Sequence, residues 1–148
     1  MEKQISAKHK KLCKKYGVDP ELVPEIHSFE AACKDREIDP KKLPIVKGIE
    51  KRHQKRIIAD YKLSIIAEAI RGGKTADYTN INEDKWYVRF LVKADAKRPS
   101  GFGLSYYDYG LWYSNAHVGV RLCFPHWDQA KFFGMQFMDL HIDHQLYT

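Results

Sequence analysis

The chain has 148 residues, a formal net charge of +6 and 44% hydrophobic residues, so it fits one domain of ordinary globular composition, or one domain with an arm. No apolar run approaches the roughly 20 residues of a membrane span, and the first residues contain no apolar stretch of a secretory signal, so we expect no membrane partner. Its three cysteines, Cys13, Cys33 and Cys123, are too far apart for a disulfide framework, so we expect a reduced, cytoplasmic protein.

The positive charge is concentrated in the first 60 residues. These carry 15 Lys and Arg against 10 Asp and Glu, whereas residues 61–148 carry 10 against 9. The excess lies in three clusters, at 8–11, 14–15 and 51–56. Such clusters can neutralise phosphates, or they can simply keep a helix face solvated. Both interpretations stay open at this point.

Two copies of a short unit, offset by twenty residues, occur near the N-terminus. Residues 12–24 align with 32–44, and both copies have Cys-Lys, three further residues, Val or Ile, Asp-Pro, then Val or Leu and a closing Pro. Each copy predicts a short helix and then a turn, where Asp can act as an N-cap; Ser28 is expected to cap the second short helix. Two copies are too few for a solenoid, so residues 1–48 are expected to form a helical arm, packed on the main domain or reaching away from it. The two cysteines, at equivalent positions, are then small buried hydrophobic residues.

Residues 49–148 are expected to form a globular domain that begins and ends with a helix. From 49 to 71, apolar residues recur at spacings of three and four, which is typical of an amphipathic helix. Gly72-Gly73 would end this helix, because glycine takes a left-handed cap conformation without strain. The final helix is predicted from about 125 or 126 to 141.

Between these helices, hydrophobic and polar residues alternate with a period of two. The segments 86–93, 102–107 and 117–124 predict three half-buried antiparallel strands. Fourteen of the nineteen aromatic residues lie between 86 and 137, so some rings are expected to face a ligand. The predicted fold class is α+β: a three-stranded antiparallel sheet packed on two helices, with an N-terminal helical arm. The side chains expected in the core are Trp86, Phe90, Val118, Val120, Leu122, Phe133 and Phe137.

Two of the predicted strands carry basic residues on one face. Tyr87, Arg89 and Lys93 share a face of the first strand, and His117 and Arg121 share a face of the third. If the two faces coincide, they form a basic surface with an aromatic ring, which suits phosphates and stacked bases. The alternative is a solvent face on which long side chains cover Tyr87. Together with the basic cluster of the long helix, the candidate nucleic-acid-binding residues are Lys51, Arg52, Lys55, Arg56, Tyr87, Arg89, Lys93 and Arg121.

The segment Gly101–Tyr107 has part of the RNP1 pattern of RNA-recognition motifs. It departs from that pattern at Ser100, Leu104 and Ser105, and an RNA-recognition motif needs a strand before its first helix. What we keep from this comparison is the feature itself, an aromatic strand flanked by glycines. The order of helix, three strands and helix also occurs in double-stranded RNA-binding domains. This likeness is an analogy of topology alone.

Other chemistry finds little support in the sequence. His141 and His144 could present a pair of imidazoles to zinc from one helical turn, but a third ligand would have to come from elsewhere. No catalytic triad, phosphate-binding loop or dinucleotide fingerprint is present. We therefore predict no catalytic residues, no metal site and no cofactor.

A set of spaced motifs fills the segment from residue 59 to residue 141. They are Tyr61-Lys62-Leu63, Tyr78-Thr79-Asn80-Ile81-Asn82, Lys85-Trp86-Tyr87, Ser100-Gly101-Phe102-Gly103 with Ser105, Val118 to Phe124, and Gln136-Phe137 with Asp139-Leu140. With these motifs the segment resembles a group of small uncharacterised proteins of gut Bacteroidales and their prophages. It departs from the group at Val120 and at Pro125-His126-Trp127. The resemblance implies a phage or mobile-element context in a bacterial host and transfers no site.

The leading hypothesis is a non-enzymatic nucleic-acid-binding protein of phage or mobile-element origin, with DNA or RNA as its partner. Lys and Arg would supply affinity through counterion release, and aromatic rings would stack on bases. The alternative is a protein-interaction or structural protein, such as a virion component or host-factor inhibitor, that docks through the aromatic region Tyr106–Tyr113. An enzyme ranks third. The expected location is the cytoplasm of the host, with the virion as the other candidate.

Overall fold

The computed structural model describes residues 4–98, 100–112 and 120–146, and its first two helices both begin at a serine. The Ser6 side chain accepts the His9 N–H at the start of α1 (Ala7–Tyr16). Ser28 accepts the Ala31 N–H at the start of α2 (Phe29–Asp35), which confirms the predicted cap.

The two repeat units share hydrogen bonds as well as sequence. In each, the N–H five residues after the cysteine donates to the cysteine carbonyl, at 3.0 Å for Cys13 and 2.8 Å for Cys33. Asp19 and Asp39 each accept the N–H two residues further on, at 2.9 and 3.0 Å. Each aspartate therefore closes a side-chain turn, and no helix follows either one.

The long helix α3 (Lys51–Ile70) confirms the helix predicted at 49–71. Gly72 and Gly73 follow it with φ angles of 66° and 80°, and the Gly73 N–H donates to the Glu68 carbonyl at 2.9 Å. The glycines end the helix as expected, because a side chain would be strained in this left-handed backbone.

The sheet consists of a single hairpin. The strands β1 (Lys85–Ala94) and β2 (Phe102–Trp112) pair antiparallel. Arg89 lies opposite Asp108 and Phe90 lies opposite Tyr106, so Tyr107 is an extra residue that forms a β-bulge.

The third strand predicted at 117–124 is wrong for the described residues. Val120–Leu122 form a short 3₁₀ helix, η1, and a single bridge joins Phe124 to Trp86. The Arg71 guanidinium donates to the carbonyls of Arg121 and Cys123, so these acceptors are not free for a neighbouring strand. Residues 117–119 lie outside the described part of the chain.

The predicted final helix is two helices. α4 (Trp127–Gln136) and α5 (Met138–Gln145) meet at Phe137, which has the non-helical angles φ −110° and ψ 32°. α4 packs against β1 and β2, whereas α5 packs mainly against α3. The break therefore turns the chain from the sheet to the long helix.

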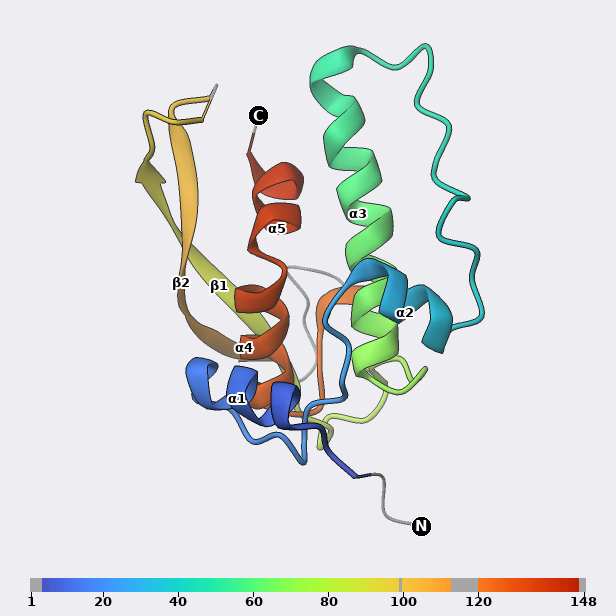
Figure 1. Cartoon of the computed structure of the whole chain (residues 1–148), viewed down its shortest axis with the longest axis vertical. Helices are drawn as coiled ribbons and strands as arrows, with labels where there is room; N and C mark the ends of the chain where they lie inside the picture. The colour runs from blue at the N-terminus through green and yellow to red at the C-terminus, as the bar shows by residue number, and fades with distance from the viewer. Residues whose placement is uncertain (1–3, 99, 113–119, 147–148) are drawn as a thin grey trace.

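The elements lie in successive layers, with the hairpin beside α4 and α5, then α3, then α2 (Figure 1). α3 thus packs mainly on other helices, not on the sheet as predicted. The buried core extends through these layers and includes Cys13, Cys33, Leu63 and Phe133. Residues of the predicted arm therefore belong to the same core as the rest of the chain.

The expected core residues have mixed outcomes. Phe133 and Phe137 are buried, whereas Trp86, Phe90 and Leu122 are only half-buried. Val118 and the side chain of Val120 lie outside the description. Among the helices described, none has the length and apolarity that a membrane crossing requires.

Candidate nucleic-acid interface

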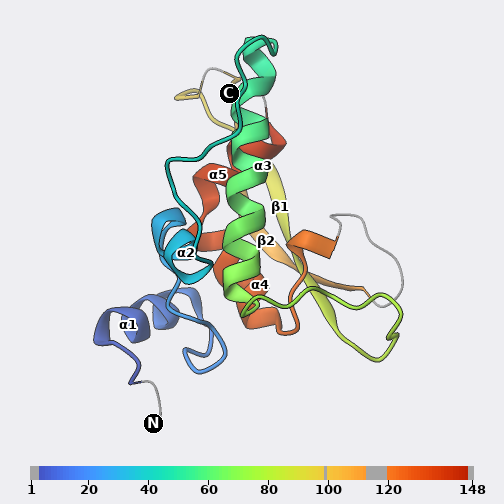
Figure 2. The same cartoon turned by 90° about the vertical axis from the view of Figure 1, so that its right-hand side faces the viewer.

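The first two turns of α3 carry four exposed cations, Lys51, Arg52, Lys55 and Arg56. Arg52 forms an ion pair with Glu50, with Nε 3.1 Å from Oε1. The other three form no ion pair with any residue in the described ranges. This end of α3 rises beyond α2, beside the end of α5 (Figure 1 and Figure 2). The cluster is therefore open to a large anionic partner.

The two arginines of this cluster continue the buried stripe of α3. The stripe repeats at alternating spacings of three and four along the helix: Ala59, Leu63, Ile66 and Ile70. Arg52 and Arg56 occupy the two preceding positions of the same series, so they lie on the side of α3 that faces the protein. Lys55, four residues before Ala59, lies as close to this stripe as Arg56 does, and Lys51 lies further to one side.

A cleft of about 250 Å³ separates the ends of α3 and α5. Its lining consists of Arg52, Arg56, His144, Gln145 and Leu146. His144 Nε2 lies 3.1 Å from Oδ1 of Asp60, whereas the buried Nδ1 has no hydrogen-bond partner within the described structure. The cleft thus brings two guanidinium groups and one imidazole together.

The outer face of the hairpin carries Tyr87, Arg89 and Lys93, as predicted from the alternation. Arg89 is bound through two nitrogens to the carboxylate of Asp108, and its guanidinium lies 5.6 Å from the centre of the Tyr107 ring. The Tyr87 ring covers Gly110, where any Cβ would overlap it. Because Asp108 neutralises Arg89, this face offers one unpaired cation, Lys93, among the residues predicted here.

Arg121 lies apart from the other candidates. Its side chain is exposed, but its carbonyl accepts a hydrogen bond from Arg71, just past the C-terminal end of α3. Fifteen residues separate Arg56 from Arg71, which corresponds to roughly 22 Å along the helix. The basic faces of the first and third predicted strands do not form one surface in the described structure. His117 lies outside the described residues. The eight candidates therefore fall into three groups.

A further basic cluster lies on α1, where Lys8, Lys10, Lys11, Lys14 and Lys15 are exposed. Figure 1 places α1 at the end of the molecule opposite the beginning of α3. The basic clusters of the first 56 residues thus do not merge into one surface.

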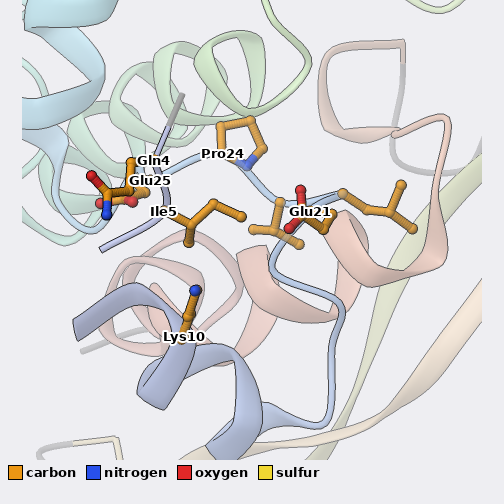
Figure 3. A pocket seen from close by; sticks show the side chains of 8 residues that line it. Gln4, Ile5, Lys10, Glu21, Pro24 and Glu25 are labelled. Carbon is orange, nitrogen blue, oxygen red and sulfur yellow. The ribbon is translucent and has the colours of Figure 1, made fainter. Parts of the chain in front are cut away.

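A cavity of about 1080 Å³ near the N-terminus is an open groove (Figure 3). Lys10, Glu21 and Glu25 contribute charges of both signs to its lining. The Glu25 carboxylate accepts hydrogen bonds from Ser6 N and Oγ at 2.7 and 2.8 Å, which lower the pKa of Glu25. With its acids partly bonded and its charges mixed, the groove favours no ligand class.

A histidine pair that the sequence pattern did not indicate lies under this groove. His9 is fully buried, with Nδ1 2.8 Å from Nε2 of His27 and Nε2 2.7 Å from the Val23 carbonyl. His9 therefore donates from Nε2 to the Val23 carbonyl, and in the neutral ring Nδ1 accepts from His27. Burial, with nearby carboxylates, raises the pKa of the adjacent Cys13 to about 11, so its thiol stays protonated at neutral pH. The arrangement is structural and offers no thiolate nucleophile.

Two buried cations, Arg71 and Lys85, were also missed. Lys85 Nζ donates to the carbonyls of Asn80 and Glu83 at 3.0 and 2.9 Å and lies 5.1 Å from the centre of the Tyr78 ring. It ties the loop before β1 to the strand. No sequence signal distinguishes this lysine from the exposed ones, because its partners are backbone carbonyls.

His141 does not form a zinc site with His144. His141 is buried, and its Nε2 lies 3.2 Å from the Phe133 carbonyl. Burial lowers the pKa of His141 to about 3. In the part of the chain that is described, no three His, Cys, Asp or Glu residues cluster as metal ligands.

The predicted aromatic docking region is largely turned inward. Tyr109 stacks on Trp127 with 5.1 Å between ring centres and meets Trp86 edge-on. Tyr106 lies beneath Lys131 of α4. Both tyrosines are half-buried, and Tyr113 lies outside the described residues. Tyr106 and Tyr109 therefore pack the hairpin against α4 and do not form an exposed edge.

Comparison of the chain with protein-family models, with curated proteins and with solved structures finds no match. The candidate site therefore rests on its own geometry.

Proposed function

We propose that this chain is a non-enzymatic nucleic-acid-binding protein that binds DNA or RNA through the first two turns of α3. The single observation that carries this proposal is the cluster of Lys51, Arg52, Lys55 and Arg56, of which three have no counter-charge in the described structure. Cations on one open helix segment can contact successive phosphates and release their counterions. The resemblance to proteins of gut Bacteroidales and their prophages extends the proposal to a phage or mobile-element context.

The paired Arg89 and the separate Arg121 are not part of this proposed interface. Arg89 would have to give up its two charge-assisted hydrogen bonds to Asp108 before it could contact a phosphate. Lys93 and Tyr87 could add contacts only to a nucleic-acid strand that reaches the outer face of the hairpin.

The test is a titration of labelled single-stranded and double-stranded DNA and RNA at low and at physiological salt. We expect binding to at least one of the four at low salt, with affinity that falls steeply as salt rises. Absence of binding to all four at low salt would falsify the proposal.

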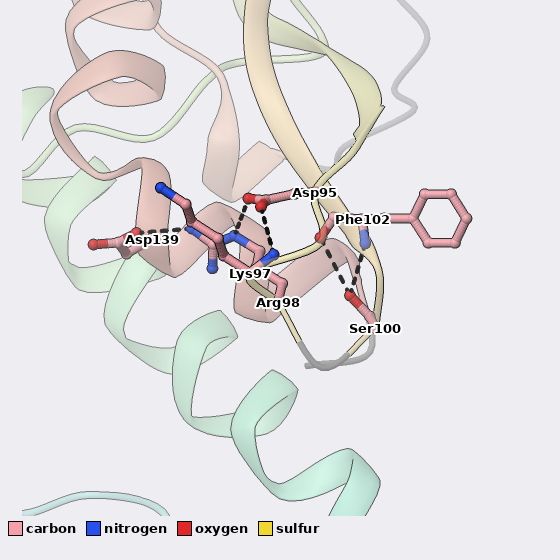
Figure 4. Close-up of polar contacts among 6 residues, drawn as sticks. All are labelled: Asp95, Lys97, Arg98, Ser100, Phe102 and Asp139. Carbon is pink, nitrogen blue, oxygen red and sulfur yellow. Dashed lines mark hydrogen bonds and ion pairs between the residues drawn. The ribbon is translucent and has the colours of Figure 1, made fainter.

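A second candidate function, protein interaction, is favoured by exposed apolar side chains on the hairpin. Leu91, Val92, Phe102 and Tyr107 are 46%, 61%, 52% and 56% exposed. Figure 4 shows the Phe102 ring pointing away from the protein, while Arg98 links the turn to Asp139 of α5. Exposed apolar side chains on a hairpin whose turn is anchored suit a protein partner. A protein that copurifies with the chain, is unaffected by nuclease and high salt, and is lost in Phe102→Ser would support this alternative.

A further inference from the structure

We propose that the cleft between α3 and α5 binds one phosphate group, held by Arg52 and Arg56 and oriented by His144. The inference deepens the proposed function, since it names what the first turns of α3 recognise. The assignment of this phosphate to a nucleic acid rests on the proposed function, whereas the anion site itself does not.

The first support is the placement of the arginines. A helix that packs on a neighbour normally continues its buried stripe with apolar residues. Here the series of Ala59, Leu63 and Ile66 is preceded by two arginines one turn apart, at the positions that face α5. Guanidinium groups so placed can donate in parallel to the oxygens of one phosphate.

The charges within the cleft leave these donors available. Arg52 binds Glu50 through Nε, so its two terminal nitrogens remain for a ligand. Arg56 has no ion pair among the residues described. The volume of about 250 Å³ exceeds the roughly 30 Å³ of a water molecule several-fold, which leaves room for a phosphate with bound water.

His144 supplies the second, independent feature. Its Nε2 donates to Asp60, and its buried Nδ1 is left without a partner. His144 also lines the cleft, so a phosphate held by the two arginines would lie against its ring. Asp60 of α3 is the ion-pair partner of this ring, and Arg52 and Arg56 share the cleft with it.

The decisive experiment compares two double variants that remove the same charge from the same two turns. In Arg52→Gln/Arg56→Gln the cleft loses both guanidinium groups, whereas Lys51→Gln/Lys55→Gln changes lysines of the nucleic-acid interface that do not line the cleft. Inorganic phosphate is titrated into each full-length protein while the amide shifts of residues 52–56 and 144–146 are followed by NMR.

We expect the arginine variant to bind phosphate at least tenfold more weakly, and the lysine variant to weaken binding by less than about threefold, because charged hydrogen bonds are lost only in the former. Circular dichroism spectra identical to the parent's establish that both variants are folded. Equal weakening in the two variants, or no phosphate-dependent shift in the parent, overturns the proposal.

Sulfate, as a second tetrahedral anion, gives a separate test of His144, which lines the cleft. Sulfate affinity should fall severalfold in His144→Gln, measured at one fixed pH. An affinity that is unchanged in His144→Gln removes His144 from the site.

Oligonucleotides with a 5′-phosphate, a 3′-phosphate or only hydroxyl ends separate the two sources of the phosphate. A preference for one phosphorylated end that Arg52→Gln/Arg56→Gln abolishes assigns the cleft to a strand terminus. Equal binding of all three, weakened in the arginine variant, assigns it to internal phosphodiesters. If the parent binds phosphate and no oligonucleotide, the cleft stands and the proposed nucleic-acid function fails.

Discussion

Several buried polar side chains in this protein donate to backbone carbonyls, and Lys85 is the clearest case. Its side chain is fully buried, its Nζ donates to two carbonyls of the preceding loop, and it forms no ion pair with a described residue. Removal of the donor would leave two carbonyls without their partner in a site where burial makes that costly.

We therefore expect Lys85→Met, which preserves the length of the side chain, to lower the free energy of unfolding by about 2–4 kcal/mol. Urea denaturation followed by tryptophan fluorescence measures this change. The exposed Lys97→Met is the matched control and should change stability by less than about 0.5 kcal/mol. A Lys85→Met protein as stable as the parent would show that water satisfies the loop carbonyls instead.

His141 makes stability depend on pH. Because burial lowers its folded pKa to about 3, below the unfolded value near 6.5, the unfolded chain binds the extra proton first as pH falls. Its contribution is complete above about pH 6.5 and declines by about 1.4 kcal/mol per pH unit below it, until about pH 3. The lowered pKa of His27, also caused first by burial, acts in the same direction.

Between pH 7 and pH 5 the parent should thus lose about 2 kcal/mol through His141. His141→Gln keeps a donor for the Phe133 carbonyl and should show a shallower loss over the same range, in urea titrations at both pH values. His126→Gln, at an exposed position, should retain the parent's slope. The interpretation fails if the slope of His141→Gln equals that of the parent.

At the level of the elements, Gly134 determines how closely α4 approaches the hairpin. A Cβ at this position would overlap Val88 Cγ2 and lie 3.1 Å from Val88 Cβ. Gly→Ala within a helix usually stabilises by about 1 kcal/mol, but here the clash should reverse the sign and destabilise by about 1–3 kcal/mol.

The double variant Gly134→Ala/Val88→Ala provides the check, since it removes the clashing methyl groups. Gly134→Ala should cost less in the Val88→Ala background than in the parent, by at least about 1 kcal/mol in a double-mutant cycle. Additive effects in thermal and urea unfolding would mean that the helix shifts and avoids Val88 altogether.

The elements that sequence predicted correctly depend on local chemistry, and the others on distant partners. Ser28 caps its helix and Gly72 ends another because these signals act within one turn. Over residues 120–124 the predicted third strand is replaced by a 3₁₀ turn and a bridge residue, and the carbonyls of Arg121 and Cys123 accept from Arg71, fifty residues away. The division of α4 from α5 likewise follows from packing on two different neighbours.

The candidate site shows the same limit. The spacing of Arg52 and Arg56 in series with Ala59 could be read from the sequence, but their role depends on the end of α5, which periodicity does not place there. Arg89 was assigned to the correct face, and its neutralisation by Asp108 required the register of the hairpin, including the bulge.

At the scale of the whole molecule, the positive charge is divided between two ends, and this division allows a test of where nucleic acid binds. The cluster of α3 and the lysines of α1 lie at opposite ends (Figure 1). If the net charge alone attracted a polyanion, removal of four charges from either end would have the same effect. A local interface predicts an unequal effect.

We expect the fourfold alanine variant of Lys51, Arg52, Lys55 and Arg56 to have a shallower slope of log affinity against log salt. The reduction should correspond to about three or four phosphate contacts, because each contact contributes roughly 0.7–0.9 to the slope. The charge-matched fourfold alanine variant of Lys8, Lys11, Lys14 and Lys15 should change the slope by less than one contact. Binding isotherms at several salt concentrations, analysed as the logarithm of affinity against the logarithm of salt, give both slopes. Equal slopes in the two variants would mean that the whole-protein field, and not the beginning of α3, governs binding.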